Sequence, residues 1–281
     1  MIPDNSTNFL YLSGVLPIKL PQFYKRFEKL LQELKIDFDL LPNTKDIWAV
    51  DFMPIQINKN RFIQFKYKPD YLNIYPEDIP VVDKIYNSIK RNQWSLLKSD
   101  LLVDGGNISK TNDTVIMCDK VFHENKKISE KELIKQLKNL FEVDKIFFVP
   151  WNKYDFTGHV DGMVRFIDNK TVLINDYSKE NAKYQRAFRM SLHNAGLDWL
   201  ELPYNPADDS TLTSAKGLYL NYLQMEQAIV VPTFKSTFDE KAIRILEDIF
   251  KRETIVPIES NDVAKRGGIL NCISRNIFNN T

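Results

Sequence analysis

Short apolar runs rich in β-branched residues alternate with segments of helical periodicity along the whole chain. Runs of this length and content are typical of buried strands, whereas apolar residues three and four positions apart are typical of helices with one buried face. Proline or glycine follows most of the strand-like runs. The alternation predicts a mixed α/β fold in which a strand–helix–strand unit recurs about five times. Because the copies share a pattern rather than residues, the sequence alone gives weak support for internal symmetry.

The clearest helical segment is 22–36, where Phe23, Phe27 and Leu31 fall on one face among lysines and glutamates. A capping box, Ser129 to Glu132, marks the start of another helix. Further helices are expected at 79–92, 179–195 and 238–252, and strands at 61–67, 114–118, 145–149, 171–174, 228–231 and 255–258.

Length and charge restrict the class of protein. With 281 residues and 43% hydrophobic content, the chain can bury a large core, and we expect a single domain over residues 1–281. A net charge of +1 gives no broad electrostatic case for binding nucleic acid or an anionic membrane. No apolar run approaches the roughly 20 residues that span a bilayer, and the first residues lack the features of a signal peptide. We therefore expect a cytoplasmic protein, and homo-oligomerisation is left open.

The two cysteines have very different surroundings. Cys272 follows the pair Gly267-Gly268, where missing Cβ atoms allow a tight turn or the close approach of a ligand. It is either a small buried hydrophobe, which is the commonest role of a free cysteine, or a nucleophile. Cys118 lies inside an apolar strand-like run and is expected to be a buried structural residue. It serves as an internal control for Cys272.

Among the three histidines, His159 has the most informative neighbours, because Gly158 precedes it and Asp161 follows at the second position. If this segment is extended, the two side chains project from the same face and can meet one ligand. A structural histidine at the start of a strand is the alternative. His123 and His193 lack comparable neighbours, and we expect them on helices or at the surface.

Two further carboxylates lie beside residues that form turns. Asp51 falls between Trp48 and Pro54 at the end of an expected strand, and Asp104 precedes a Gly-Gly-Asn run. A plain turn explains either segment taken alone. A thiol, an imidazole and several carboxylates together suit a cationic substrate. The sequence contains no Cys-x-x-Cys, His-Glu-x-x-His, dinucleotide or phosphate-loop motif, so we expect neither a metal nor an organic cofactor.

Five short motifs follow one another across nearly the whole chain, each of them weak alone. They are Trp-x-x-Asp-x-x-Pro at 48–54, acidic-Gly-Gly-Asn at 104–107, Gly-His-x-Asp-x-x-x-Arg-Phe at 158–166, Tyr-x-Asn-Tyr leading to Val-Pro-x-Phe at 219–234, and Gly-Gly-x-x-x-Cys at 267–272. In this order and spacing they resemble the agmatine deiminase and bacterial (Porphyromonas-type) peptidylarginine deiminase family, which belongs to the guanidino-group-modifying penteins.

The resemblance implies a pentein fold, a five-bladed α/β propeller with pseudo-five-fold symmetry and a central active site. It also implies residue roles by motif match. Cys272 would be the nucleophile and His159 the acid/base, with Asp51 and Asp161 holding the guanidinium and Trp48 packing against the substrate. Asp104 stands where agmatine deiminases usually carry a glutamate, and would contact the distal part of the substrate.

The implied function is hydrolysis of a guanidino group, with agmatine converted to N-carbamoylputrescine and ammonia, a step of putrescine and polyamine metabolism. A guanidinium is planar and always charged, so two carboxylates can hold and orient it through charge-assisted hydrogen bonds. Its carbon is a poor electrophile, so attack calls for a thiolate, and an imidazolium can protonate the departing ammonia. This covalent route through a cysteine thiouronium needs a small guanidino substrate and no cofactor.

The chain departs from the family pattern at two positions. Val50 replaces an arginine, and Asn271 replaces the histidine that usually precedes the cysteine. The chain is also shorter than most agmatine deiminases. Other hypotheses therefore stay open: a deiminase that converts peptidyl or free arginine to citrulline, an amidinotransferase, or a non-catalytic pentein that binds a guanidino ligand or a protein partner.

Overall fold

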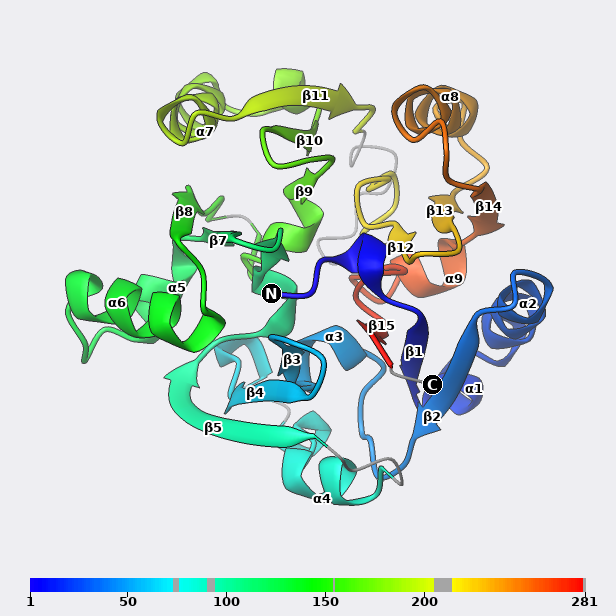
Figure 1. The fold of residues 1–281 in the computed structure, drawn as a ribbon. Helices are drawn as coiled ribbons and strands as arrows, with labels where there is room; N and C mark the ends of the chain where they lie inside the picture. Colours follow the sequence, from blue (N-terminus) through cyan, green and yellow to red (C-terminus); the bar gives the residue numbers. More distant parts are fainter. Residues whose placement is uncertain (73–75, 90–93, 154, 205–213, 280–281) are drawn as a thin grey trace.

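The computed structural model contains five three-stranded sheets arranged around a common centre, with the larger helices at the perimeter (Figure 1). It describes residues 1–72, 76–89, 94–153, 155–204 and 214–279. In each sheet the middle strand pairs antiparallel with an inner strand and parallel with an outer one. The expected mixed α/β fold built from five recurring units is confirmed.

The strands of each sheet, given from inner to outer, follow a regular order along the chain. They are β15 (Ser274–Ile277), β1 (Phe9–Ser13) and β2 (Asp37–Leu41); β3 (Ile55–Gln56), β4 (Arg61–Lys66) and β5 (Ser95–Leu102); β6 (Ser109–Lys110), β7 (Thr114–Cys118) and β8 (Lys145–Val149); β9 (Val164–Phe166), β10 (Thr171–Asn175) and β11 (Asp198–Leu202); and β12 (Leu223–Gln224), β13 (Ile229–Thr233) and β14 (Ile255–Glu259).

A helix connects the middle strand to the parallel outer strand in each unit, because parallel neighbours need a long crossover. The connecting helices are α1 (Leu16–Lys19), α2 (Pro21–Glu33), α4 (Val82–Asn87), α5 (Lys120–Glu124), α6 (Glu130–Phe141), α7 (Ala182–Asn194) and α8 (Asp239–Ile249). The short helices α3 (Ala49–Phe52) and α9 (Asn261–Ala264) lie instead between successive sheets. Short 3₁₀ turns that matter below are η1 (Asp4–Ser6), η4 (Gly105–Asn107) and η5 (Val160–Gly162).

The first and last strands of the chain close the ring. β15, close to the C-terminus, pairs antiparallel with β1, with Phe9 opposite Ile277. This pairing brings residues from the two ends of the sequence into one sheet. It also fixes the segment just before β15, which contains Cys272, beside the centre of the ring.

The predicted elements are found close to their expected positions. The helix expected at 22–36 ends at Glu33, because Lys35 adopts a left-handed conformation (φ 55°) that turns the chain towards β2. Within the segment expected at 79–92, α4 covers Val82–Asn87, and residues 90–92 lie outside the described residues. The inner strands escaped prediction because most of them are only two or three residues long, too short to have a readable period.

Local signals explain why the helices form where they do. Phe23, Phe27 and Leu31 of α2 are fully buried, so the apolar face seen in the sequence packs on the core. At the start of α6 the Ser129 hydroxyl accepts a hydrogen bond from the Glu132 amide, as the capping box predicts.

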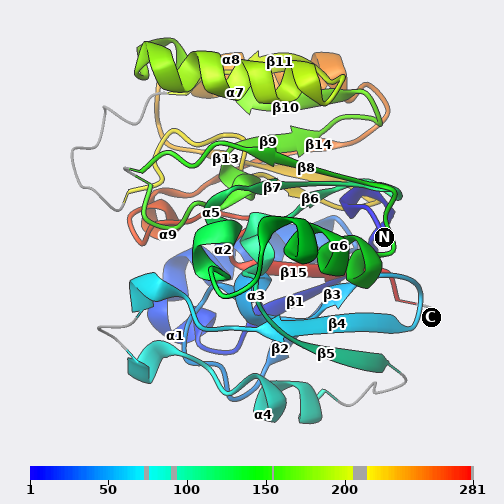
Figure 2. The same ribbon diagram turned by 90° about the vertical axis from the view of Figure 1, so that its left-hand side faces the viewer.

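The ring of five sheets has two different faces. Viewed from the side, α5 and α9 lie towards one face, whereas the N-terminus lies towards the other (Figure 2). Within the part of the chain that the structure describes, no helix is long and apolar enough to span a membrane.

Candidate active site

Segments from distant parts of the sequence meet near the centre of the ring. α3 packs against η4, and η4 packs against η5. The Val50 amide donates to the Cys272 carbonyl at 3.3 Å, which joins α3 to the segment before β15. Asp51 lies within α3, so the expectation that it ends a strand is wrong. The single helical turn, closed by a Met53 to Ala49 hydrogen bond, directs the Asp51 side chain inwards, where it is buried.

His159 is held between two carboxylates. Its Nε2 atom lies 3.1 Å from Oδ2 of Asp104, and its Nδ1 atom lies 3.5 Å from Oδ1 of Asp51. Asp51 Oδ1 also accepts a hydrogen bond from the Gly106 amide at 3.0 Å, and Asp104 Oδ2 accepts one from the Tyr71 hydroxyl at 3.1 Å. Both carboxylates are therefore fixed by a second donor. Asp104, expected to contact the distal part of a substrate, contacts His159, and its contact with a substrate stays a prediction.

Glycine is required in the turn beside this histidine. A Cβ atom at Gly106 would lie 2.7 Å from both Asp51 Oδ1 and His159 Nδ1. Side chains do not tolerate contacts this short, so the Gly-Gly-Asn motif allows the imidazole and the carboxylate to approach the backbone. The asparagine of the motif has a structural role. The Asn107 side chain accepts a hydrogen bond from the Cys118 amide and donates one to the Cys118 carbonyl.

Asp161 turns towards the cysteine rather than towards the partners of His159. The segment is not extended as expected, because Val160–Gly162 forms the 3₁₀ turn η5 with His159 as its first flanking residue. Asp161 Oδ2 lies 3.6 Å from Cys272 Sγ, in a position to accept the thiol hydrogen. The hypothesis that His159 and Asp161 project from one extended face is therefore wrong, although both reach the same site.

Cys272 is partly exposed, and a hydrogen bond from its backbone amide fixes its position. The Cys272 amide donates to Asn221 Oδ1 at 3.3 Å. A Cβ atom at Gly268 would lie 3.0 Å from Cys272 Sγ and 2.6 Å from the Trp48 ring, so the missing side chain lets the indole and the thiol lie side by side. The structure thus brings together all six residues singled out from the sequence: Trp48, Asp51, Asp104, His159, Asp161 and Cys272.

The electrostatics of the site favour an imidazolium at His159 and a protonated thiol at Cys272. Burial lowers the pKa of His159, but attraction to Asp51 and Asp104 outweighs burial and raises that pKa well above its usual value. Burial raises the pKa of Asp51, and the charges of Asp104 and Asp161 add to the rise. The pKa of Cys272 is also raised, by burial and by the charges of Asp161 and Asp51. Three carboxyl side chains thus share this site with a single basic side chain, His159.

The control cysteine behaves as expected. Cys118 is fully buried in β7, where burial raises its pKa to about 12. A thiol with such a pKa is inert at neutral pH. His123 and His193 are exposed on α5 and α7, which agrees with their expected helix or surface positions.

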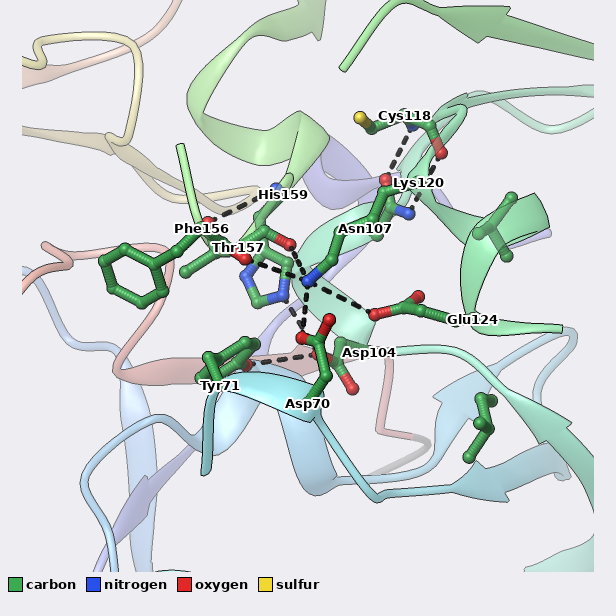
Figure 3. Close-up of polar contacts among 12 residues, drawn as sticks. Asp70, Tyr71, Asp104, Asn107, Cys118, Lys120, Glu124, Phe156, Thr157 and His159 are labelled. Atoms are coloured by element: carbon green, nitrogen blue, oxygen red, sulfur yellow. Dashed lines mark hydrogen bonds and ion pairs between the residues drawn. The ribbon is translucent and has the colours of Figure 1, made fainter. Parts of the chain in front are cut away.

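Sequence reasoning missed a buried lysine beside the site. Lys120, only 1% exposed, donates to Asp70 Oδ1 at 2.8 Å and to the carbonyl oxygens of Phe156 and Thr157 at 2.9 and 3.1 Å (Figure 3). Gly158 has a φ of +61°, and a Cβ atom there would lie 2.8 Å from the Lys120 stem. Lys120 thus anchors the loop that leads into His159.

Tyr71 and Asn221 were also missed as site residues. Tyr71 bonds to Asp104, and the Lys120 ammonium lies 5.2 Å from the centre of its ring. Asn221 lies in the Tyr-x-Asn-Tyr motif, which was noted but given no role. No local signal identifies Lys120 or Tyr71, since both act through contacts between segments distant in sequence. Among the described residues, no group of three or more His, Cys, Asp or Glu side chains is arranged to hold a metal ion.

Comparison with solved structures places the fold. A cysteine-to-serine variant of agmatine deiminase from C. jejuni, solved with substrate bound, has a TM-score of 0.80 at 21% identity, covering 99% of this chain and 95% of that one. A DDAH variant from Pseudomonas aeruginosa, solved with citrulline, has a TM-score of 0.60 at 11% identity, covering 96% and 99%. These likenesses confirm the expected pentein fold.

Comparison of sequences gives the family. Agmatine deiminase of Pseudomonas aeruginosa strain UCBPP-PA14 is 23% identical over 72% of this chain and 63% of its own length. The chain thus spans less than two thirds of the curated relatives that it matches. The model of the Porphyromonas-type peptidyl-arginine deiminase family matches residues 18–277. Because this match covers most of the sequence, the protein belongs to the Porphyromonas-type peptidyl-arginine deiminase family.

Proposed function

We propose that this protein is a cysteine-dependent guanidine hydrolase, and that its substrate is agmatine, which it converts to N-carbamoylputrescine and ammonia. One observation carries the proposal. The carboxylates of Asp51, Asp104 and Asp161 surround one imidazole and one thiol in a largely buried site. The excess negative charge, together with burial, raises the pKa values of Asp51 and Cys272. A bound guanidinium would supply the missing positive charge.

The geometry suggests how a substrate would activate the nucleophile. Without a cation, Asp161 and Asp51 disfavour the Cys272 thiolate. A guanidinium bound by these two carboxylates would neutralise them and lower the pKa of the thiol next to the carbon to be attacked. Asp161 Oδ2, at 3.6 Å from the sulfur, is placed to accept the thiol proton. Substrate binding and thiolate formation are therefore linked.

The reaction then needs only the groups already in place. The thiolate adds to the guanidinium carbon, and His159, an imidazolium between two carboxylates, donates a proton to the departing nitrogen. Ammonia leaves, and the sulfur stays bonded to the carbon as a thiouronium. The neutral imidazole next takes a proton from water, whose oxygen attacks the same carbon. As the carbon–sulfur bond breaks, the proton held by Asp161 returns to the sulfur and the hydroxyl proton is lost to solvent, which gives the ureido product and the free thiol.

Two considerations support agmatine as the substrate. The matching solved structures include an agmatine deiminase with its substrate bound, and the curated relatives are named as agmatine deiminases. Free arginine carries an α-carboxylate that would need a cationic partner. Lys120 and Arg165 both lie beside the site, but both are already engaged in ion pairs. Agmatine has no such carboxylate.

Arginine in a peptide is the second candidate, because the matching family model is named for peptidyl-arginine deiminase. The test is to incubate the pure protein with agmatine, free arginine and an arginine peptide, and to measure ammonia and ureido product. Agmatine is expected to give the highest kcat/KM. A higher value for the peptide would replace agmatine with peptidyl arginine, and transfer of the amidino group to an added amine would indicate an amidinotransferase.

The cysteines provide a matched pair of variants. Cys272→Ser should lower turnover by about 10³-fold or more, because the nucleophile is lost. Cys118→Ser should leave turnover largely unchanged, since Cys118 is buried in β7. Absence of product from every guanidine, with a folded wild-type protein, would overturn the proposed hydrolase. Binding of agmatine without turnover would then favour a non-catalytic pentein.

A further inference from the structure

Asn271, one of the two residues that depart from the family pattern, uses the polar groups of its side chain and its backbone amide inside the site. It is 8% exposed. Its side-chain Nδ2 donates to Asp161 Oδ2 at 2.7 Å, its Oδ1 accepts from Arg165 Nη1 at 3.0 Å, and its backbone amide donates to Asn221 Oδ1 at 3.1 Å. Three hydrogen bonds therefore hold Asn271 in one position and orientation within the site.

Arg165 fixes which way the Asn271 amide faces. A guanidinium donates hydrogen bonds and accepts none, so the atom of Asn271 that meets it must be the carbonyl oxygen. Arg165 is itself held by the Tyr222 carbonyl at 3.0 Å, by Asp4 Oδ2 at 2.9 Å and by the Tyr222 ring. Since Arg165 cannot move freely, the amide cannot flip. Its NH₂ group is therefore directed at Asp161.

The hydrogen bond from Asn271 reaches the oxygen that faces the nucleophile. Asp161 Oδ2 accepts from Asn271 Nδ2 at 2.7 Å, and the same oxygen lies 3.6 Å from Cys272 Sγ. A neutral donor stabilises the ionised carboxylate and disperses its charge without adding a positive charge that would compete with a cationic substrate. It also fixes the position of Asp161 relative to the sulfur.

The histidine usual in the family could satisfy the same two partners. A neutral imidazole offers one acceptor nitrogen and one donor N–H, which matches what Arg165 and Asp161 require. Asparagine offers the same pair of functions through its carbonyl and its NH₂ group. The replacement therefore keeps the hydrogen-bonding pattern while it changes the side chain.

We propose that Asn271 is a positioning residue: oriented by the Asp4–Arg165 ion pair, it donates a fixed hydrogen bond to Asp161 and thereby holds that carboxylate against the Cys272 thiol and the guanidinium of the substrate. This inference rests on the proposed hydrolase function, and it deepens that function by assigning a role to a residue that touches neither substrate nor reacting atoms.

Two variants of Asn271 separate the effect of its hydrogen-bond donor from the effect of the volume that the side chain fills. Asn271→Leu has similar size and no donor, and it should lower kcat/KM by about 10- to 100-fold, the effect of losing a hydrogen bond to a charged group. Asn271→His restores one donor and one acceptor and should recover most of that loss. Asn125→Leu is the control, because Asn125 is a buried asparagine whose amide bonds to the Leu102 and Val121 carbonyls outside the site.

Asn271→Asp gives a readout that a merely structural role would not produce. At pH 8 the introduced carboxylate faces Asp161 without a proton between them, so kcat/KM should fall by about 100-fold or more. At lower pH the two carboxyls share a proton and the donor returns. The ratio of wild-type to variant kcat/KM should therefore shrink as the pH falls. For Asn125→Leu that ratio should not depend on pH.

A second measurement does not need turnover. The rate at which iodoacetamide alkylates Cys272 can be followed by mass spectrometry, with buried Cys118 as internal reference. Loss of the donor leaves the full Asp161 charge beside the sulfur, so Asn271→Leu should slow alkylation of Cys272 at pH 8 by about threefold or more. Asn125→Leu should alkylate at the wild-type rate.

The outcomes distinguish the two proposals. If no guanidine is turned over but alkylation of Cys272 responds to Asn271→Leu, the hydrolase function is wrong and the positioning role stands. If the wild type is active and a folded Asn271→Leu matches it in both measurements, the positioning role is wrong. If Asn271→Leu does not fold, Asn271→Asp decides, and a wild-type-to-variant ratio that stays constant with pH overturns the role.

Discussion

The Nε2 atom of His159 lies 3.1 Å from Oδ2 of Asp104, so the imidazole is bound to the carboxylate that precedes the Gly-Gly-Asn turn. The two residues are separated by 55 positions in the sequence. This contact, with that of Asp51, keeps His159 protonated despite its burial. Asp104 therefore holds the imidazole, and the contact with the distal part of a substrate that the resemblance implies stays a prediction.

Asp104→Asn tests this relationship. Removing the negative charge should lower the pKa of His159, because Asp104 raises it both by charge and by a hydrogen bond. In the proposed mechanism the imidazolium is the form that protonates the leaving nitrogen, so the alkaline limb of the kcat/KM–pH profile should move to lower pH. Asp198→Asn, at an exposed position of β11, is the control. An unchanged alkaline limb would remove Asp104 from this role.

Gly106→Ala should damage the site more than the fold. The added Cβ atom would lie 2.7 Å from His159 Nδ1 and Asp51 Oδ1, so one of these groups must move. A displacement of this kind is expected to cost about 10²-fold in kcat/KM. Gly196→Ala should have the opposite effect, lowering the stability of the fold and leaving kcat/KM unchanged. No atom lies within 4 Å of its added Cβ, but its φ of +70° strains alanine by about 1 kcal/mol. Kinetics and urea denaturation of both variants check the contrast.

Lys120→Met should destabilise the protein and lower its activity together. The ammonium ties Asp70 to the Phe156 and Thr157 carbonyls, so its removal leaves a carboxylate and two carbonyl oxygens without their donor. Asp70 is 46% exposed and stays solvated, so the cost comes mainly from the two carbonyl oxygens that lose their donor, about 1–3 kcal/mol of unfolding free energy. The loop before His159 also loses its anchor. Lys127→Met, at an exposed position, should match the wild type in melting temperature and kcat/KM.

Asp4 should stabilise the fold at neutral pH and lose this effect in acid. Burial opposes its ionisation, but Lys110, Arg165 and Arg275 outweigh burial and lower its pKa from 3.8 to about 2. A depressed pKa stabilises the folded state above the unfolded value, here by about 2 kcal/mol. That contribution falls as the pH drops from about 4 through about 2.

Urea denaturation of the wild type and Asp4→Asn checks this. The difference in unfolding free energy should be largest above pH 4 and should shrink below it. Asp37→Asn, at an exposed position of β2, is the control. A difference between wild type and Asp4→Asn that is the same at pH 6 and at pH 3 would contradict the assigned pKa.

The recurring α/β pattern, the amphipathic face of α2 and the distinction between the two cysteines could all be predicted from the amino-acid sequence. Each of these features depends on residues close together in the sequence. The spacing of Phe23, Phe27 and Leu31 indicates the buried face of α2, and the glycines before Cys272 distinguish it from Cys118. The sequence also indicated the site residues through motifs whose glycines permit close approach, as at Gly106 and Gly268.

The pairing of polar groups in the site could not be predicted in this way, because it depends on how the chain folds. Asn271 bonds to Asp161 across 110 positions, and Arg165 bonds to Asp4 across 161. Local periodicity cannot specify such pairs, because they depend on how the five sheets pack around their centre. For the same reason Asn271, which in the sequence is only a departure from the family, becomes in the folded protein the donor directed at Asp161.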